Sequence, residues 1–207
     1  MRERLSLVYG TLWRRAGTLD YEIRRTAAAF LFLAALSFGV CAACPSLGQR
    51  LADYLTELIG DMGVVTGEGR LSAPALFANN LRACMVTMLY GLLPFLYLPA
   101  LALGMNALAL GGLGAWYLHQ GGSLAAWLAG LLPHGVFELP ALVLSMAMGL
   151  CVCGHVSRRV RGDKSALSLW ECLALTSRML FLAAAPLLAA AALAEAYVTP
   201  AVAAFFS

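Results

Sequence analysis

The side chains of this chain that could do chemistry are concentrated in one short apolar stretch. His134 and Glu138 are four residues apart, and between Ser123 and Cys153 they are the only ionisable side chains other than cysteine thiols. On a helix this spacing places both on one face, where an imidazole and a carboxylate can form a polar binding site or transfer protons. The alternative is a structural pair, in which polar groups inside an apolar protein satisfy one another.

The composition identifies the environment in which these two residues must work. Of 207 residues, 61% are hydrophobic and 12% are charged, and the mean hydropathy is +0.80. Soluble domains have roughly 45 to 50% apolar and about 25% charged residues. We therefore predict an all-α, polytopic membrane helix bundle that forms a single domain over residues 1–207, with the lipid bilayer as its surroundings.

The apolar runs predict about five transmembrane helices, since each crossing takes about 20 residues. The segment 123–132 is apolar but has only ten residues between Gly122 and Pro133, too few to cross. We expect it to form a re-entrant or interfacial half-helix, and residues 165–176 to form an amphipathic linker that carries Trp170. The predicted spans are 26–44, 77–98, 101–118, 135–153 and 179–197.

The distribution of charge predicts the orientation. Six arginines precede residue 26 and four basic residues cluster within 158–164, whereas residues 45–76 carry four acidic and two basic side chains. The positive-inside rule then places the N-terminal segment 1–25 and the 158–164 loop in the cytoplasm, and the 45–76 loop outside. We predict a multi-pass protein of the bacterial cytoplasmic (inner) membrane with a cytoplasmic N-terminus.

The N-terminal segment itself has two alternatives. Apolar residues recur at helical spacing within residues 3–18, which predicts an amphipathic helix on the cytoplasmic face, while a frayed basic tail fits equally well. A secretory leader is disfavoured because 25 residues, including Glu3, Asp20 and Glu22, precede a 19-residue apolar run, and leaders have shorter basic and apolar regions.

Polar residues in the predicted spans define a candidate site. The second and fourth spans both enter from the outside, so their first turns should lie at a similar depth, in the outer third of the membrane. An ion pair between Arg82 and Glu138 is therefore expected, and Asn106 is a further candidate for interhelical hydrogen bonding. The predicted intramembrane polar cluster comprises Asn79, Asn80, Arg82, Asn106, His134 and Glu138.

Metal chemistry is not indicated by the sequence. Catalytic zinc normally takes three protein ligands, and the other histidines, His119 and His155, are expected on opposite sides of the membrane. Cys151-x-Cys153-x-His155 has ligand-like spacing, but cysteine among small residues is more typical of packing. Phosphate loops, serine elbows and nucleic-acid-binding patches are also missing from the sequence, so we predict no cofactor, no nucleic-acid partner and no enzymatic activity.

Small residues repeat every four positions along two predicted spans, which allows helix backbones to approach closely. Such stripes pack within one chain or across a homodimer, and the intrachain arrangement is the default. The stripes are Ala107, Gly111 and Ala115 in the third span and Ser145, Gly149 and Cys153 in the fourth.

Several of these motifs together resemble a known family. Asn79-Asn80-Leu81-Arg82, Gly91, Pro94, Asn106 and the segment 132–141, which contains Pro133-His134-Gly135-Val136-Phe137-Glu138, are similar to the stage II sporulation protein M family over roughly residues 75–155. Founding members of that family scaffold cell-wall hydrolases during engulfment. The resemblance implies a non-enzymatic membrane scaffold that docks other membrane or cell-envelope proteins. The alternative is a small transporter or channel with a polar site at Arg82, His134 and Glu138.

Overall fold

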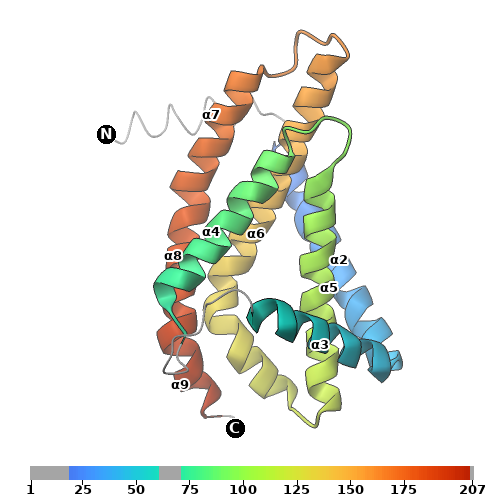
Figure 1. Ribbon diagram of the computed structural model, residues 1–207, viewed down its shortest axis with the longest axis vertical. Helices are drawn as coiled ribbons and strands as arrows, with labels where there is room; N and C mark the ends of the chain where they lie inside the picture. Colours follow the sequence, from blue (N-terminus) through green and yellow to red (C-terminus); the bar gives the residue numbers. More distant parts are fainter. Residues whose placement is uncertain (1–18, 61–70, 206–207) are drawn as a thin grey trace.

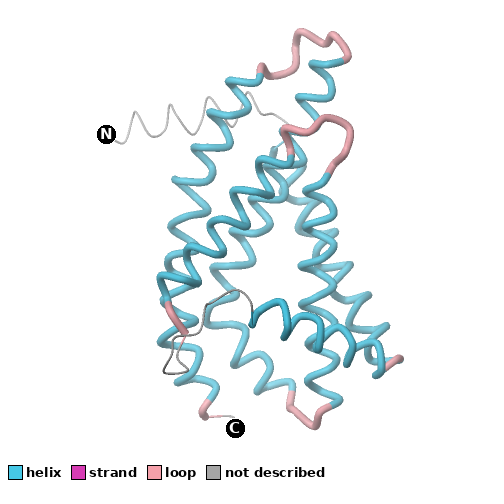
Figure 2. The backbone as a smooth tube through the Cα atoms, viewed as in Figure 1, coloured by secondary structure: helices cyan, strands magenta, loops and turns pink. Residues whose placement is uncertain are grey.

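The computed structural model describes residues 19–60 and 71–205, except for the side chains of residues 59, 60 and 203, and confirms the all-α bundle (Figures 1 and 2). The predicted N-terminal helix over residues 3–18 lies outside the described residues. The helices are α2 (Leu19–Ala43), α3 (Pro45–Gly60), α4 (Ala73–Tyr90), α5 (Leu98–His119), α6 (Leu124–Val160), α7 (Leu169–Met179), α8 (Ala185–Leu193) and α9 (Thr199–Ala203).

Four helical segments of the described chain are long and apolar enough to cross a membrane, one fewer than the five expected. They are α2, α5, α6 and the continuous segment 169–202. The missing one is α4, the predicted second span. It has 18 residues and runs alongside the other helices (Figure 1), but Asn79, Asn80 and Arg82 in its middle lower its hydropathy. The protein is therefore a multi-pass membrane protein in which one packed helix is markedly more polar than the rest.

The expected half-helix at 123–132 is not a separate element. It is the beginning of α6, which continues through Pro133 and Pro140 to Val160 over 37 residues. A proline lacks the amide hydrogen that would bond the carbonyl four residues earlier, and its ring crowds that turn, so the helix bends. The first part of α6, yellow in Figure 1, accordingly runs obliquely to the rest. His134 and Glu138 lie between the two prolines, in this distorted region.

The last helical segment is also continuous, which corrects the expected linker at 165–176. Ser168 and Glu171 form a reciprocal capping box that starts α7, and Trp170 is an exposed residue of its first turn. Two π-helical turns, Leu180–Ala184 and Ala194–Val198, interrupt this segment without ending it. Pro200 cannot donate to the carbonyl of Ala196, which favours the wider hydrogen-bonding pattern of the second π-turn.

The two ends of the bundle differ in character. In Figure 1 the start of α2 lies at the upper end, with the loops 91–97 and 161–168, and we call this the basic end. At the lower end α3 lies across the long helices, near the turn 120–123 and the C-terminus, and we call this the α3 end. The basic loop and the start of α2 lie at the same end because α2, α4, α5 and α6 run alternately down and up the bundle (Figure 1).

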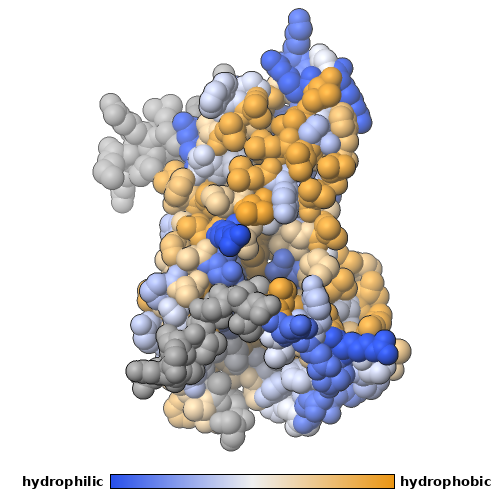
Figure 3. Space-filling view, viewed as in Figure 1, coloured by the Kyte–Doolittle hydropathy of each residue, from blue (hydrophilic) through white to orange (hydrophobic). Residues whose placement is uncertain are grey.

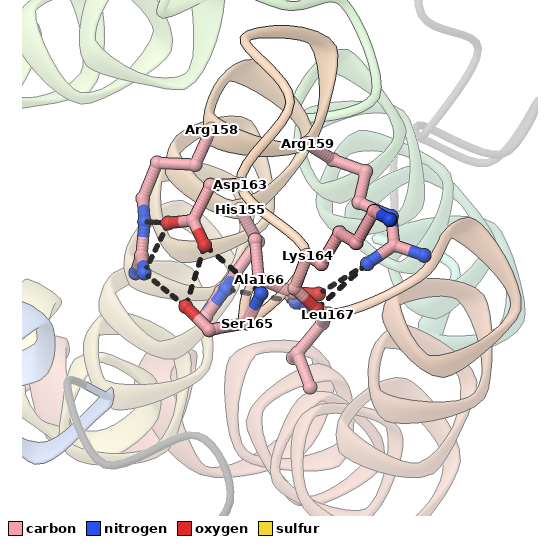
Figure 4. A network of polar contacts seen from close by, with 8 residues as sticks. All are labelled: His155, Arg158, Arg159, Asp163, Lys164, Ser165, Ala166 and Leu167. Carbon is pink, nitrogen blue, oxygen red and sulfur yellow. Dashed lines mark hydrogen bonds and ion pairs between the residues drawn. The ribbon is translucent and has the colours of Figure 1, made fainter.

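Polar contacts hold the basic loop in one conformation (Figure 4). Asp163 accepts hydrogen bonds from the Arg158 guanidinium at 2.8 Å and from the amide and hydroxyl of Ser165. These donors, chiefly Ser165 and then Arg158, lower the pKa of Asp163 to about 2, so the carboxylate is ionised at neutral pH. Arg159 donates to the backbone carbonyls of Lys164 and Ala166.

The two small-residue stripes pack inside the chain. Ala107, Gly111 and Ala115 are buried, and Gly111 is so close to α2 that an added Cβ would overlap the carbonyl oxygen of Ala34. On α6, a Cβ on Gly149 would meet the Thr87 carbonyl of α4 and the Pro99 ring of α5 at 2.7 Å. Ser145 and Cys153 on the same stripe are buried, and the Cys153 thiol donates to the carbonyl of Leu93.

Replacing Gly111 by alanine tests this close approach. The added methyl group would push against the backbone of α2, and we expect a loss of stability of about 1 to 3 kcal/mol, the usual cost of overpacking. Gly104→Ala is the matched control on the same helix, because nothing lies within 4 Å of its added Cβ. Thermal unfolding in detergent should show a lower midpoint for Gly111→Ala only; equal midpoints would contradict the packing.

Candidate functional site

The polar site is centred on Glu138 of α6, and side chains of α4 and of the end of the last helical segment complete it. One carboxylate oxygen of Glu138 accepts a hydrogen bond of 3.1 Å from the Asn80 amide of α4. The other oxygen lies 4.0 Å from Nε2 of His134, one turn earlier on α6. Nδ1 of His134 lies 3.2 Å from the hydroxyl of Thr199, the first residue of α9. Each of the two α6 side chains is thus held by a different neighbouring helix.

A second carboxylate completes the cluster from the last helical segment. Glu195 lies in the π-turn Ala194–Val198 and is half-buried. Its carboxylate, that of Glu138 and a ring nitrogen of His134 lie within 4.8 Å of one another. A π-turn contains an extra residue and changes the direction of its side chains, and such turns are frequent at functional sites. We call His134, Glu138 and Glu195 the triad.

A cavity of about 390 Å³ borders the two carboxylates of the triad. Its polar lining comes from α4, α5, α6 and the π-turn, and apolar residues of α6 such as Leu142 and Met146 also line it. In Figure 3 the surface is hollowed between α4 and α5, with hydrophilic side chains beside the hollow. The polar lining residues are Asn79, Asn80, Thr87, Asn106, Glu138, Ser145 and Glu195.

His134 borders a second cavity, of about 400 Å³, on its other side. This cavity lies near the turn between α5 and α6 and is lined mainly by Tyr117, Trp127 and Leu131. The rings of Tyr117 and Trp127 are in contact, with their centroids 5.6 Å apart. The His134–Glu138 pair therefore lies between a largely aromatic cavity and a polar one.

The structure brings together only part of the predicted polar cluster. Asn79, Asn80, Asn106 and Glu138 line one cavity, and the amide of Asn106 bonds the Ala102 carbonyl of its own helix rather than another helix. Arg82 does not reach Glu138. It is exposed on α4, and in the described part of the chain no ion pair or hydrogen bond involves it. The prediction from depth considered only the position along the helix axis. The side of α4 that carries Asn80, and not the side that carries Arg82, faces Glu138.

Glu195 and Thr199 were not among the residues singled out in the sequence. A signal for Glu195 exists, because it is the only ionisable residue between Arg178 and the tyrosine at position 197. An ionisable residue in an apolar span is a candidate functional residue by itself. Thr199 carries no comparable signal, because a threonine beside a proline near a helix end is common.

The fold and the site define a multi-pass helical membrane protein with a polar cluster between α4, α6 and the end of the last helical segment. The family model described as stage II sporulation protein M matches residues 28–200, so the chain belongs to this family. The match extends well beyond the 75–155 region in which the motifs lie. No curated protein and no solved structure matches the chain.

Asn80→Ala tests whether α4 supports Glu138. The change leaves one oxygen of a largely buried carboxylate without its donor, at a cost of about 1 to 3 kcal/mol. Arg82→Gln is the control on the same helix, and because Arg82 is exposed and forms no ion pair with another described residue, we expect a change within about 0.5 kcal/mol. Unfolding in detergent measures both changes. A larger loss of stability for Arg82→Gln than for Asn80→Ala would support the Arg82–Glu138 ion pair that the sequence predicted.

Proposed function

We propose that this protein is a non-enzymatic scaffold of the bacterial inner membrane, which docks another cell-envelope protein at its α3 end. The observation that carries this proposal is α3 itself. It is an amphipathic helix that lies across the end of the bundle rather than along it (Figure 1), so that one side faces away from the spans. Membership in the stage II sporulation protein M family supports the same role.

Direct bonds to α5 hold α3 in place. The side-chain oxygen of Gln49 accepts hydrogen bonds from the Trp116 indole at 2.9 Å and from the Gln120 amide at 3.1 Å. Gly48 and Ala52 are buried on the same side of α3. A helix fixed in this way presents its other side without further ordering, which reduces the entropic cost of binding a partner.

The outward side of α3 combines an apolar stripe with negative charge. Leu47, Tyr54 and Leu58 are spaced by seven and four residues and are between 41% and 55% exposed. Asp53 and Glu57 flank this stripe. The whole segment 45–76 carries four acidic and two basic residues. The chemistry that fits is a partner segment with basic residues around an apolar or aromatic anchor, since charge complementarity favours correct encounter.

Photo-crosslinking from α3 in native membranes tests the docking proposal. A photoreactive residue at Tyr54 should give one discrete protein adduct, whereas the same residue at Leu31, which is 67% exposed on α2, should react mainly with lipid. Glu57→Lys should reduce the Tyr54 adduct several-fold by like-charge repulsion with a basic partner. Asp20→Lys, an exposed charge reversal at the basic end, should leave it unchanged.

The crosslinking result also discriminates between partners. An adduct with the mass of two copies of this chain would mean that the partner is a second copy of this protein and not a different protein. An adduct at Tyr54 that is insensitive to Glu57→Lys, or none at all, would contradict docking through this face of α3.

The proposed orientation places the basic end in the cytoplasm and the α3 end outside. Cys44, between α2 and α3, is the exposed member of the six free cysteines, and the other five are buried. A membrane-impermeant maleimide should therefore label the wild-type protein in intact cells, and Cys44→Ser should abolish that labelling. In the Cys44→Ser background, Lys164→Cys should react only after permeabilisation. The opposite pattern would invert the orientation.

The two cavities favour a second candidate function, transport of a small polar or cationic species past the triad. One cavity borders His134 and the other borders Glu138 and Glu195. Polar groups on discontinuous or distorted helices are typical of transporter sites. Solute flux in proteoliposomes distinguishes the two candidates, because a transporter would produce flux and a scaffold would not.

A further inference from the structure

We propose that His134, Glu138 and Glu195 bind a divalent transition-metal ion of the zinc class, which joins α6 to the end of the last helical segment. In the sequence only His134 and Glu138 are close together. The fold brings Glu195, which is 57 residues after Glu138, to the same place. This inference does not depend on docking at α3, because the triad and α3 share no residue.

The geometry of the triad is that of potential metal ligands. One ligand atom from each residue lies within 4.8 Å of the others, and Nε2 of His134 is 4.0 Å from the nearer Glu138 oxygen. Zinc lies about 2.0 to 2.2 Å from nitrogen and oxygen ligands, so two ligands of one tetrahedral ion are about 3.4 Å apart. The His134–Glu138 separation of 4.0 Å is slightly longer than this, and small side-chain rotations would bring the two atoms and a Glu195 oxygen to that spacing.

The surroundings of His134 and Glu138 resemble the outer shell of a metal site. A ligating histidine normally binds metal through one ring nitrogen while the other donates to a fixed acceptor. Here the Thr199 hydroxyl lies 3.2 Å from Nδ1 and can accept its proton, which leaves the lone pair of Nε2 directed toward Glu138. Asn80 holds the far oxygen of Glu138 in turn, at 3.1 Å.

Charge balance points in the same direction. With both glutamates ionised and the imidazole neutral, the triad would carry a charge of −2, and within the described residues no arginine or lysine forms an ion pair with either carboxylate. Uncompensated charges are costly inside a membrane protein. One divalent cation would neutralise the site without protonating any of its three ligands.

The cavities supply access and an open coordination position. Glu138 and Glu195 face a cavity of about 390 Å³, and His134 faces one of about 400 Å³. Either is large enough for water, which would complete a tetrahedral shell of three protein ligands and one solvent molecule. Because the ligands come from α6 and from the π-turn, the bound ion would also hold these two segments together.

Metal analysis of the purified full-length protein tests the proposal. After chelator treatment, incubation with zinc chloride and removal of free zinc, we expect one tightly held ion per chain. Glu138→Gln and Glu195→Gln should each weaken binding by at least about a hundredfold. Thr199→Val, which removes only the partner of Nδ1, should weaken it by about 10 to 100-fold. His119→Gln removes a histidine outside the triad and should leave affinity unchanged.

A second readout keeps the test valid if a variant folds poorly. Zinc should raise the melting temperature of the wild-type protein and of His119→Gln, and should not raise that of Thr199→Val to the same extent at limiting zinc. Much less than one zinc ion per wild-type chain would overturn the proposal. That result would mean that the triad binds protons rather than a metal ion. Zinc affinity unaffected by Glu195→Gln in a well-folded variant would overturn it as well.

Discussion

The rest of this structure depends on one constraint, which is that polar groups inside an apolar bundle must find their partners within the protein. Glu138 shows how this is met. Its two oxygens are approached from different directions, by Asn80 of α4 and by His134 one turn away on α6. The donor Asn80 belongs to α4, so α4 must pack beside the bent part of α6. The polar middle of α4, which lowers its hydropathy as a span, is the same feature that makes it a partner for Glu138.

Distorted helices allow this arrangement. Two prolines bend α6 on either side of His134 and Glu138, and a π-turn presents Glu195 from the last helical segment. Regular helices would pack more uniformly but would not direct three ionisable side chains to one point. Elsewhere the helix backbones pack closely, at Gly111 against α2 and at Gly149 against α4 and α5.

The two ends of the protein have separate tasks under the proposed function. At the basic end the loop 161–168 is folded onto itself by Asp163 and its donors, and Arg161 lies 5.1 Å from the ring of Phe95 in the neighbouring loop. At the α3 end, by contrast, an amphipathic helix is bonded to α5 and leaves an apolar and acidic side uncovered. At the basic end the polar groups of the loop bond to one another, whereas at the α3 end the exposed side chains of α3 are available to a partner.

The sequence by itself determined the class of the protein, its family and the position of most helices. Composition and apolar run length are sufficient for this, because a membrane requires about 20 apolar residues per crossing wherever the chain goes. The motif around His134 and Glu138 likewise identified the centre of the site, since ionisable groups in an apolar stretch are conspicuous without any structure.

Only the tertiary structure decided which side chains meet. Arg82 and Glu138 were expected at one depth, but depth is a coordinate along a helix axis and contact also requires the right rotation about it, which packing sets. Ten apolar residues before Pro133 indicated a separate half-helix, yet neighbouring helices support the bend and α6 continues through it. Glu195 joins the site through a π-turn in a segment 57 residues from Glu138, and no local pattern in the sequence records that approach.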